Sequence, residues 1–364
     1  MSKKRPNFIV NRAAIEAPAA PPNATEDFGY ASELSAATGL NHLRVAILRI
    51  PPGLRAYPPL AMDDLEIFAF IVSGAPDLWL DGNLYRLKEG DGVLFRAGTG
   101  DAHSLLNNGD EDAHVFVISE AFRRNSRARH PNDEAADEGL KKMNMYWADA
   151  PKHKLGPNSG KPGETSGRKH ALPKTVVNWR DIVEKVANRY PNSTEDQTHP
   201  ARFGRHARFS RIGIHLDLLK PGRRTSYPHA ERDEEEFVYV VSGTVDCWID
   251  GHIHPMGAGD FVGFVAGTGI THTIINNSDA DAVLLVGAEA SRMRNQFWYP
   301  YQPSQNKAVG DLYWADHPMP KLGPHDGLPD GLRERIPKSA RRNPIAANEA
   351  ARHLKPEKKT KAKR

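Results

Sequence analysis

Two histidines and two glutamates in the second half of the chain have the residue types and the spacing of a metal site. Tyr227, His229 and Glu231 alternate along one stretch, and side chains two residues apart on a β-strand point to the same face. Glu236 must then lie on a neighbouring strand, and His272 lies on a later one. In a small barrel the inward faces converge, so one point can be surrounded by His229, Glu231, Glu236 and His272.

Imidazole and carboxylate groups bind Mn, Fe, Ni, Cu or Zn, and the carboxylates favour one divalent Fe(II) or Mn(II) ion. Glu231 is predicted to be a fourth ligand, with the alternative that it acts as an acid or base beside the metal. Tyr227 is a candidate proton donor, an orienting hydroxyl or, more commonly, a wall of the site. The competing interpretation makes Glu231–Glu236 a solvated acidic loop and the two histidines incidental.

Short strands separated by turns must position these residues. Asp81-Gly82 and Asp250-Gly251 are Asp-Gly pairs between apolar runs, a pattern that predicts β-hairpins. Helical patterns are confined to Asp133–Met145 and Trp179–Arg189. Runs of β-branched or aromatic residues predict strands at Leu43–Ile50, Phe68–Ser73, Asp77–Leu80, Gly92–Arg96 and Val115–Ser119. The sequence therefore predicts an all-β protein with peripheral helices.

The chain is an internal duplication. Phe68–Gly74 matches Phe237–Gly243, and Ala97–His103 matches Ala266–His272, with an offset near 167–169 residues throughout. We therefore predict one module at residues 1–156 and a second at 173–333. The segment 157–172 between them is rich in Gly, Pro and Ser and is predicted to be a linker.

The first module lacks most of the candidate ligands. Leu60 stands in the place of His229, Met62 in that of Glu231, and Ile67 in that of Glu236. Only His103 remains, in the place of His272, and one histidine cannot hold a first-row cation firmly. We expect this module to be metal-free and to serve as a structural or dimerising partner, with His103 hydrogen-bonded in its core. A pocket for an apolar ligand is the alternative.

The second module resembles the cupin superfamily. The first cupin motif is matched by Gly222, His229-Ala-Glu231, Glu236 and Gly243, and the second by Gly259, Val265-Ala-Gly267, His272 and Asn276. Glu231 replaces the usual histidine and Val265 the usual proline, which affects the ligand set more than the fold. The resemblance, to a mostly uncharacterised bacterial branch of double cupins, implies two tandem double-stranded β-helix (jelly-roll) barrels with short flanking helices.

The resemblance also implies a function. Double cupins with such sites act on small organic acids or aromatics through one metal ion, and we expect a dioxygenase whose chemistry lies in the second barrel. The alternatives are a metal-dependent decarboxylase, isomerase or lyase, and a non-catalytic binding or storage protein. A homo-oligomer is expected, because double cupins often assemble through barrel faces.

The basic charge of the chain belongs to its end. The 364 residues carry a net charge of +4, but the segment from Ile336 to Arg364 carries +8 and the rest −4. We expect 334–364 to be a disordered basic tail, with nucleic-acid binding as the lesser alternative. The single Cys247 excludes an internal disulfide, and the absence of an apolar run of about 18 residues excludes a membrane span. With no secretory signal pattern at its start, the protein is expected to be cytoplasmic.

Overall fold

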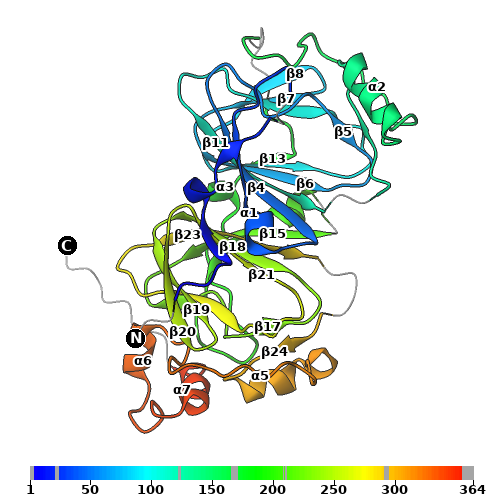
Figure 1. Ribbon diagram of the computed structural model, residues 1–364. Coiled ribbons are helices and arrows are strands. Elements are labelled where there is room, and N and C mark those ends of the chain that lie inside the picture. Colours follow the sequence, from blue (N-terminus) through cyan, green and yellow to red (C-terminus); the bar gives the residue numbers. More distant parts are fainter. Residues whose placement is uncertain are drawn as a thin grey trace, which may run out of the picture.

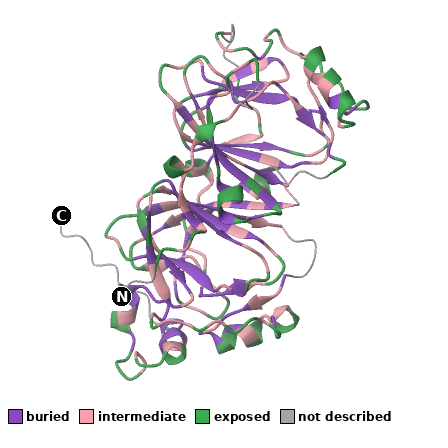
Figure 2. Ribbon diagram, viewed as in Figure 1, coloured by how far each residue is buried: buried purple, intermediate pink, exposed green. Residues whose placement is uncertain are grey.

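The computed structural model describes residues 4–20, 24–121, 124–164, 171–207, 209, 211–290 and 295–354. The chain forms two β-sheet units stacked end to end, with some of the short helices at the outer ends and others at the junction between the units (Figure 1). Buried residues follow the strands of both units, while most helical residues are exposed or half-buried (Figure 2). We call the upper unit the first module and the lower unit the second module. The prediction of an all-β, two-module jelly-roll fold is confirmed.

The first module has a large sheet that packs against smaller ones. In spatial order the large sheet contains β13 (Val176–Asn178), β9 (Asp91–Phe95), β6 (Ile67–Ser73), β11 (Ala113–Glu120), β4 (Leu43–Ile50), β3 (Tyr30–Glu33) and β2 (Ala17–Pro18). The smaller sheets contain β10 (His103–Leu106), β7 (Asp77–Leu80) and β8 (Asn83–Arg86), and separately β12 (Ala128–Arg129) with β5 (Ala61–Met62). Ile71 and Val115 of the large sheet share one apolar core with Leu78 and Leu105 of the smaller sheet, so the sheets face each other.

The second module repeats this arrangement. Its large sheet contains β1 (Ile9–Asn11), β21 (Asp260–Phe264), β18 (Glu236–Ser242), β23 (Ala282–Glu289), β15 (Ile212–Leu219) and β14 (His199–Ala201). The smaller sheets contain β16 (Arg223–Arg224), β22 (His272–Asn276), β19 (Thr244–Ile249) and β20 (His252–Gly257), and separately β17 (Ala230–Glu231) with β24 (Phe297–Trp298). The buried, reduced Cys247 lies in the apolar core between the sheets.

The two Asp-Gly hairpins form as the sequence predicts. Asp81 and Gly82 have φ angles of 46° and 80°, and Asp250 and Gly251 have φ angles of 47° and 83°. Two consecutive residues with positive φ are the requirement of the tight turn whose twist matches that of its strands. The turns join β7 to β8 and β19 to β20.

The helices are short. They are α1 (Leu34–Thr38), α2 (Glu134–Lys142), α3 (Trp179–Ile182), α4 (Phe203–Ala207), α5 (Pro303–Ala308), α6 (Asp330–Arg335) and α7 (Pro344–Ala351), with 3₁₀ turns at η1 (Arg12–Ala14) and η2 (Gly310–Leu312). The helix expected from Trp179 to Arg189 ends at Ile182, because Val183 is extended and the N–H of Glu184 donates to the Pro200 carbonyl. None of the helices in the described part of the chain is both long and apolar enough to cross a membrane.

The two modules exchange their first strands. β1 pairs with β21 of the second module, and β13 pairs with β9 of the first. The exchange is fixed by matching side-chain hydrogen bonds, from Asn11 to Asp260 (2.9 Å) and from Asn178 to Asp91 (2.8 Å). The predicted boundaries, 1–156 and 173–333, therefore differ from the sheets, because each module's first strand completes the other module's edge.

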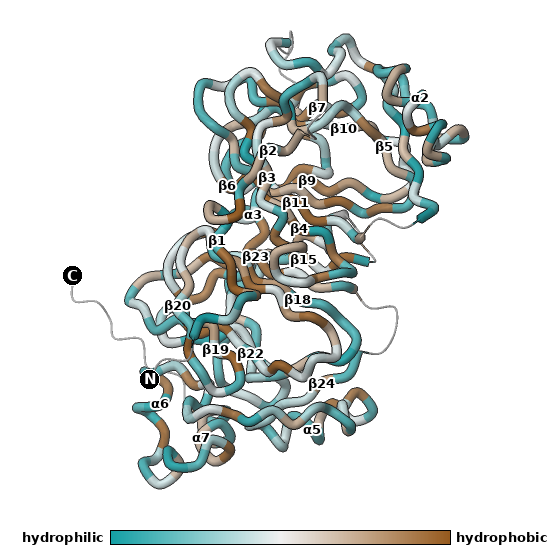
Figure 3. The backbone as a smooth tube through the Cα atoms, viewed as in Figure 1, coloured by the Kyte–Doolittle hydropathy of each residue, from teal (hydrophilic) through white to brown (hydrophobic). Residues whose placement is uncertain are grey.

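Two buried glutamates reinforce the junction from opposite sides. Glu235 of the second module accepts hydrogen bonds from the backbone N–H groups of Asn41, His42 and Leu43, at 2.8 to 3.2 Å. Glu66 of the first module accepts the equivalent bonds from residues 211 and 212. Apolar side chains fill the space between them, and Figure 3 shows hydrophobic segments of β11, β15 and β23 gathered at this junction.

The region after residue 334 corrects one prediction. We expected a disordered tail from 334 to 364, but α7 packs against α6 in a small core that includes Leu332 and Ala347. Asn348 of α7 also accepts a hydrogen bond from the fully buried Arg224, at 2.8 Å. The prediction relied on the net charge of the segment and overlooked the apolar residues of α6 and α7. Residues 355–364 lie outside the described residues. Part of the predicted linker is packed as well, because Trp79 donates to the Asn158 carbonyl (2.9 Å).

Candidate metal centre

The two candidate histidines lie opposite each other on neighbouring strands. His272 is the first residue of β22, and His229 lies just before β17. The two residues form an isolated antiparallel bridge with each other. The two backbone hydrogen bonds of this bridge measure 2.9 and 3.2 Å, and the imidazole centroids are 4.8 Å apart. The backbone pairing therefore fixes the separation of the two rings.

Hydrogen bonds to carbonyl groups set the same tautomer in both rings. Nδ1 of His229 lies 2.9 Å from the carbonyl oxygen of Tyr227, and Nδ1 of His272 lies 3.2 Å from that of Ile270. A carbonyl oxygen only accepts, so each Nδ1 carries the proton and each Nε2 is left as the metal-binding nitrogen. The ring of His272 is held further by Phe264, stacked on it at 3.6 Å, and the ring of His229 by Tyr299 at 5.7 Å.

Both carboxylates reach the Nε2 atoms. Oε2 of Glu236, the first residue of β18, lies 2.9 Å from Nε2 of His272 and 3.8 Å from Nε2 of His229. One ligand atom from each of these three residues lies within 4.8 Å of the other two. Oε1 of Glu231 lies 3.4 Å from Nε2 of His229, while its Oε2 accepts a hydrogen bond from Asn295 at 2.8 Å. Glu231 is thus next to the group of three and is oriented from outside it.

The electrostatics of the cluster suit a cation. Burial alone would lower the pKa of His229, but the hydrogen bond that its ring donates to Glu231 and the charge of Glu236 outweigh burial and raise the pKa. Burial would raise the pKa of Glu236, but the hydrogen bond and charge of His272 outweigh it and lower the pKa. The ionised carboxylate of Glu236 therefore faces the two Nε2 atoms, where a metal ion and a proton compete for the same lone pairs. The donor set, two imidazoles and one or two carboxylates, fits a divalent first-row metal.

Tyr227 does not join this cluster. Its ring stacks on Tyr190 at 4.1 Å, and its hydroxyl donates to Ser193 at 2.9 Å. The expectation that it shares a face with His229 and Glu231 relied on a regular strand, but residues 225–228 are bends, in which side chains do not alternate.

The sequence reasoning missed His215 and Asn295. His215 lies on β15, whose residues Ile214 and Leu216 face the junction between the modules, so His215 faces the interior of the second module. Burial would lower the pKa of His215, but Asp217, 3.5 Å away, and Glu236 raise it. In the sequence, the alternation of apolar and polar residues along 212–217 could have predicted which face of the strand His215 occupies. No sequence pattern predicts the contact of Asn295 with Glu231, because only the fold brings these two residues together.

The first module has the same framework with other side chains. Leu60 and His103 form the bridge that His229 and His272 form in the second module. Phe95 stacks on His103 at 3.6 Å, as Phe264 does on His272. The correspondence between residues that the sequence repeat predicts therefore holds in the structure for both members of the bridge. Apolar side chains occupy the positions of the other three candidate ligands.

The comparisons with known proteins agree with this duplication. Residues 46–119 and 215–287 each match the family model of the cupin domain. The chain belongs to the cupin superfamily, with two cupin domains. No curated protein matches this bicupin in sequence.

Solved structures share the fold of the bicupin at low sequence identity. Vicilin from tomato has 14% identity and a TM-score of 0.50, covering 82% of this chain and 88% of its own. Oxalate decarboxylase from Lactobacillus farciminis has 14% identity and a TM-score of 0.51, covering 85% and 91%. Protein Ylba from E. coli has 13% identity and a TM-score of 0.50, covering 78% and 91%. Identities this low establish the fold alone.

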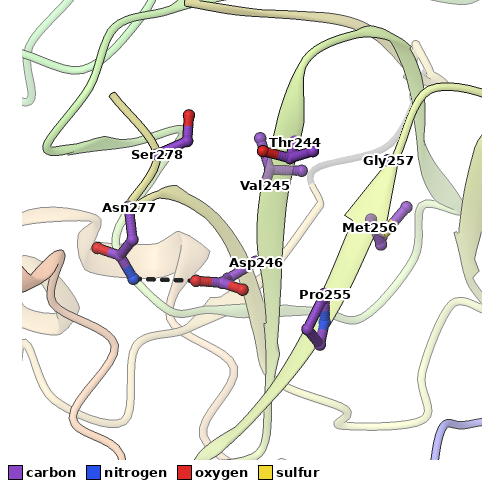
Figure 4. Close-up of a pocket in the computed structure, with 8 residues that line it drawn as sticks. All are labelled: Thr244, Val245, Asp246, Pro255, Met256, Gly257, Asn277 and Ser278. Carbon is purple, nitrogen blue, oxygen red and sulfur yellow. Dashed lines mark hydrogen bonds between the residues drawn. The ribbon is translucent and has the colours of Figure 1, made fainter. Parts of the chain in front are cut away.

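A separate hollow of about 410 Å³ lies on the outside of the second module, beside β19 and β20 (Figure 4). It is lined by Thr244, Val245, Asp246, Pro255, Met256, Gly257, Asn277 and Ser278. Asn277 donates to Asp246 at 3.0 Å, and Ser278 donates to Asn276 at 2.7 Å. Polar side chains of the hollow are therefore hydrogen-bonded within the second module, and none of them belongs to the histidine–glutamate cluster.

Proposed function

We propose that this bicupin is a mononuclear metal-dependent dioxygenase that acts on a small organic acid or aromatic in its second module. The observation that carries the proposal is the convergence of Nε2 of His229, Nε2 of His272 and the carboxylate of Glu236. Two histidines and one carboxylate leave coordination positions open and are typical of non-haem Fe(II) oxygenases.

His229, His272 and Glu236 would hold the ion, with Glu231 as a fourth ligand through Oε1 or as a carboxylate beside it. Fe(II) or Mn(II) suits the carboxylates best, and Zn, Ni and Cu are the alternatives. When bound, the ion supplies Lewis acidity and, as Fe(II), the capacity to activate dioxygen.

The remaining contributions come from the chain itself. The carbonyls of Tyr227 and Ile270 keep the imidazoles in the metal-binding tautomer. Asn295 holds one oxygen of Glu231, which leaves the other oxygen free to accept a proton near His229. Phe264 and Tyr299 supply apolar surfaces that exclude water from the two rings.

The position of Glu231 also favours a second candidate, a non-oxidative decarboxylase, isomerase or lyase. A carboxylate beside the group of three, rather than within it, can act as a general acid or base without a change in the oxidation state of the substrate. One structural relative is an oxalate decarboxylase, which makes small dicarboxylic acids a reasonable part of a substrate panel.

The test is oxygen uptake by the full chain after anaerobic loading with Fe(II), across a panel of aromatic acids, keto acids and dicarboxylic acids. We expect substrate-dependent uptake that His272→Ala abolishes and that His103→Ala, the matched change in the first module, preserves. Carbon dioxide release without uptake would favour the second candidate. Saturable binding with neither metal dependence nor turnover would favour a binding or storage protein. The homo-oligomer and the cytoplasmic location stay predictions.

A further inference from the structure

The first module contains a cavity of about 320 Å³ where the second module has its metal cluster. It is lined by Ala19, Ala31, Glu33, Arg44, Ala46, Leu48, Ala56, Tyr57, Leu60, Met62, Leu65, Ile67, His103, Val117 and Ser119. Most of these side chains are apolar, and the volume falls within the range of small-molecule sites.

One buried polar atom in this lining has no partner. Nδ1 of His103 lies 3.3 Å from the carbonyl oxygen of Asp101, which only accepts, so Nδ1 carries the proton. Nε2 is therefore an acceptor, and it is buried without a hydrogen-bond partner among the described residues. Burial also lowers the pKa of His103 to about 4, so the ring is neutral at physiological pH. An unsatisfied buried acceptor costs free energy that a donor in the cavity would recover.

The matched geometry of the modules indicates where this acceptor points. Nε2 of His272 faces Glu236, and the residue at that place in the first module is Ile67, which lines the cavity. Leu60, directly across the bridge from His103, and Met62 also line it. Met62 is unbranched and flexible, so it can move aside for a ligand that reaches Nε2.

The charges at this cavity cancel. Arg44 pairs with Glu33 at 3.3 Å, and both side chains are about half exposed, at 51% and 45%. Tyr57, which also lines the cavity, meets His103 edge-on with ring centroids 6.0 Å apart. An apolar cavity with a neutral acceptor and a self-paired ion pair selects against charged ligands, since a charge would be desolvated without a partner.

We propose that the first module binds a small uncharged hydroxylated hydrophobic molecule, of which phenol is the simplest, whose hydroxyl donates to Nε2 of His103. This gives the first module a binding role of its own, separate from the metal chemistry of the second. It also accounts for a histidine kept where the other three candidate ligands are apolar.

The test uses the full-length chain with His229→Ala and His272→Ala, freed of metal, so that phenol has no metal to bind. Calorimetric titrations compare phenol with anisole, which has nearly the same shape but no donor, and with toluene. We expect phenol to bind about tenfold more tightly than either, the usual gain from one hydrogen bond. With His103→Leu added, phenol is expected to bind no more tightly than anisole.

Equal affinities for phenol and anisole in the background protein, or no binding of phenol, would overturn the proposal, and so would a phenol preference that survives His103→Leu. The comparison among the three ligands stands even if His103→Leu fails to fold. Ala46→Phe supplies a second variant. Ala46 lines the cavity, so the phenylalanine ring should fill it and abolish the binding of all three ligands.

Discussion

Nε2 of His272 lies 2.9 Å from Oε2 of Glu236, and this contact joins the first residue of β22 to the first residue of β18 across the interior of the second module. In the first module the equivalent Nε2, that of His103, faces no carboxylate and has no hydrogen-bond partner within the described residues. The same framework therefore presents a cation-binding group in one module and a neutral acceptor in the other.

The two glutamates of the cluster should differ in their effect on metal affinity. Glu236→Gln removes the charge that faces both Nε2 atoms. Loss of a residue that only hydrogen-bonds a metal ligand weakens metal binding by up to about 100-fold, so we expect loss of the ligand Glu236 to weaken it by more than about 100-fold. Glu231→Gln should weaken it less, because Glu231 lies outside the group of three. Competition titrations against a metal-binding dye measure both affinities. The reverse order would show that Glu231 is the principal carboxylate ligand.

The buried His103 should make stability depend on pH. Burial lowers the pKa of His103 from 6.5 to about 4, so between those values the unfolded chain binds the proton and the folded chain does not. This contribution to stability is present above about pH 6.5 and is lost as the pH falls toward 4. Between pH 7 and pH 5 the loss amounts to about 2 kcal/mol.

Urea unfolding at both pH values, of the wild type and of His103→Leu, measures this contribution. We expect the wild type to lose about 2 kcal/mol more than the variant between pH 7 and pH 5. Parallel losses in the two proteins would mean that the histidine is protonated in the folded state.

The junction between the modules should depend on Glu235. Its side chain accepts three backbone N–H bonds and the residue is only 1% exposed, so Glu235→Ala leaves buried donors unsatisfied. We expect a loss of about 3 kcal/mol in the free energy of unfolding. Glu138→Ala, which removes an exposed ion pair with Lys141, is the control and should change the free energy of unfolding far less. Similar small losses for both variants would show that the junction rests on its apolar contacts alone.

The C-terminal helices should contribute to stability, although the sequence led us to expect a disordered tail. Removing residues 337–364 takes away α7, exposes the apolar face of α6 and deprives Arg224 of Asn348. We expect a loss of about 2–5 kcal/mol, measured by thermal or urea unfolding. Removing only 355–364 should leave stability unchanged. A loss of DNA retention on that shorter deletion would support the nucleic-acid role that we consider the lesser alternative.

The fold and the three central residues of the candidate site could be predicted from the sequence, because local patterns encode both. The repeat, the Asp-Gly turns and the spacing of His229, Glu236 and His272 can be read without knowing what packs against them. Tyr227 was misplaced because the alternation rule fails where the chain bends. The strand exchange was missed because the pairing of β1 with β21 joins residues about 250 apart, and no local pattern specifies such a partner.

The metal content of the purified full-length chain, measured by mass spectrometry after anaerobic loading with Fe(II) or Mn(II) and removal of free metal, decides whether the second module holds an ion. The expected result is about one ion per chain in the wild type and in His103→Ala, and close to none in His229→Ala/His272→Ala. Equal, near-zero metal in the wild type and the double variant would contradict it, as would an ion that the double variant retains.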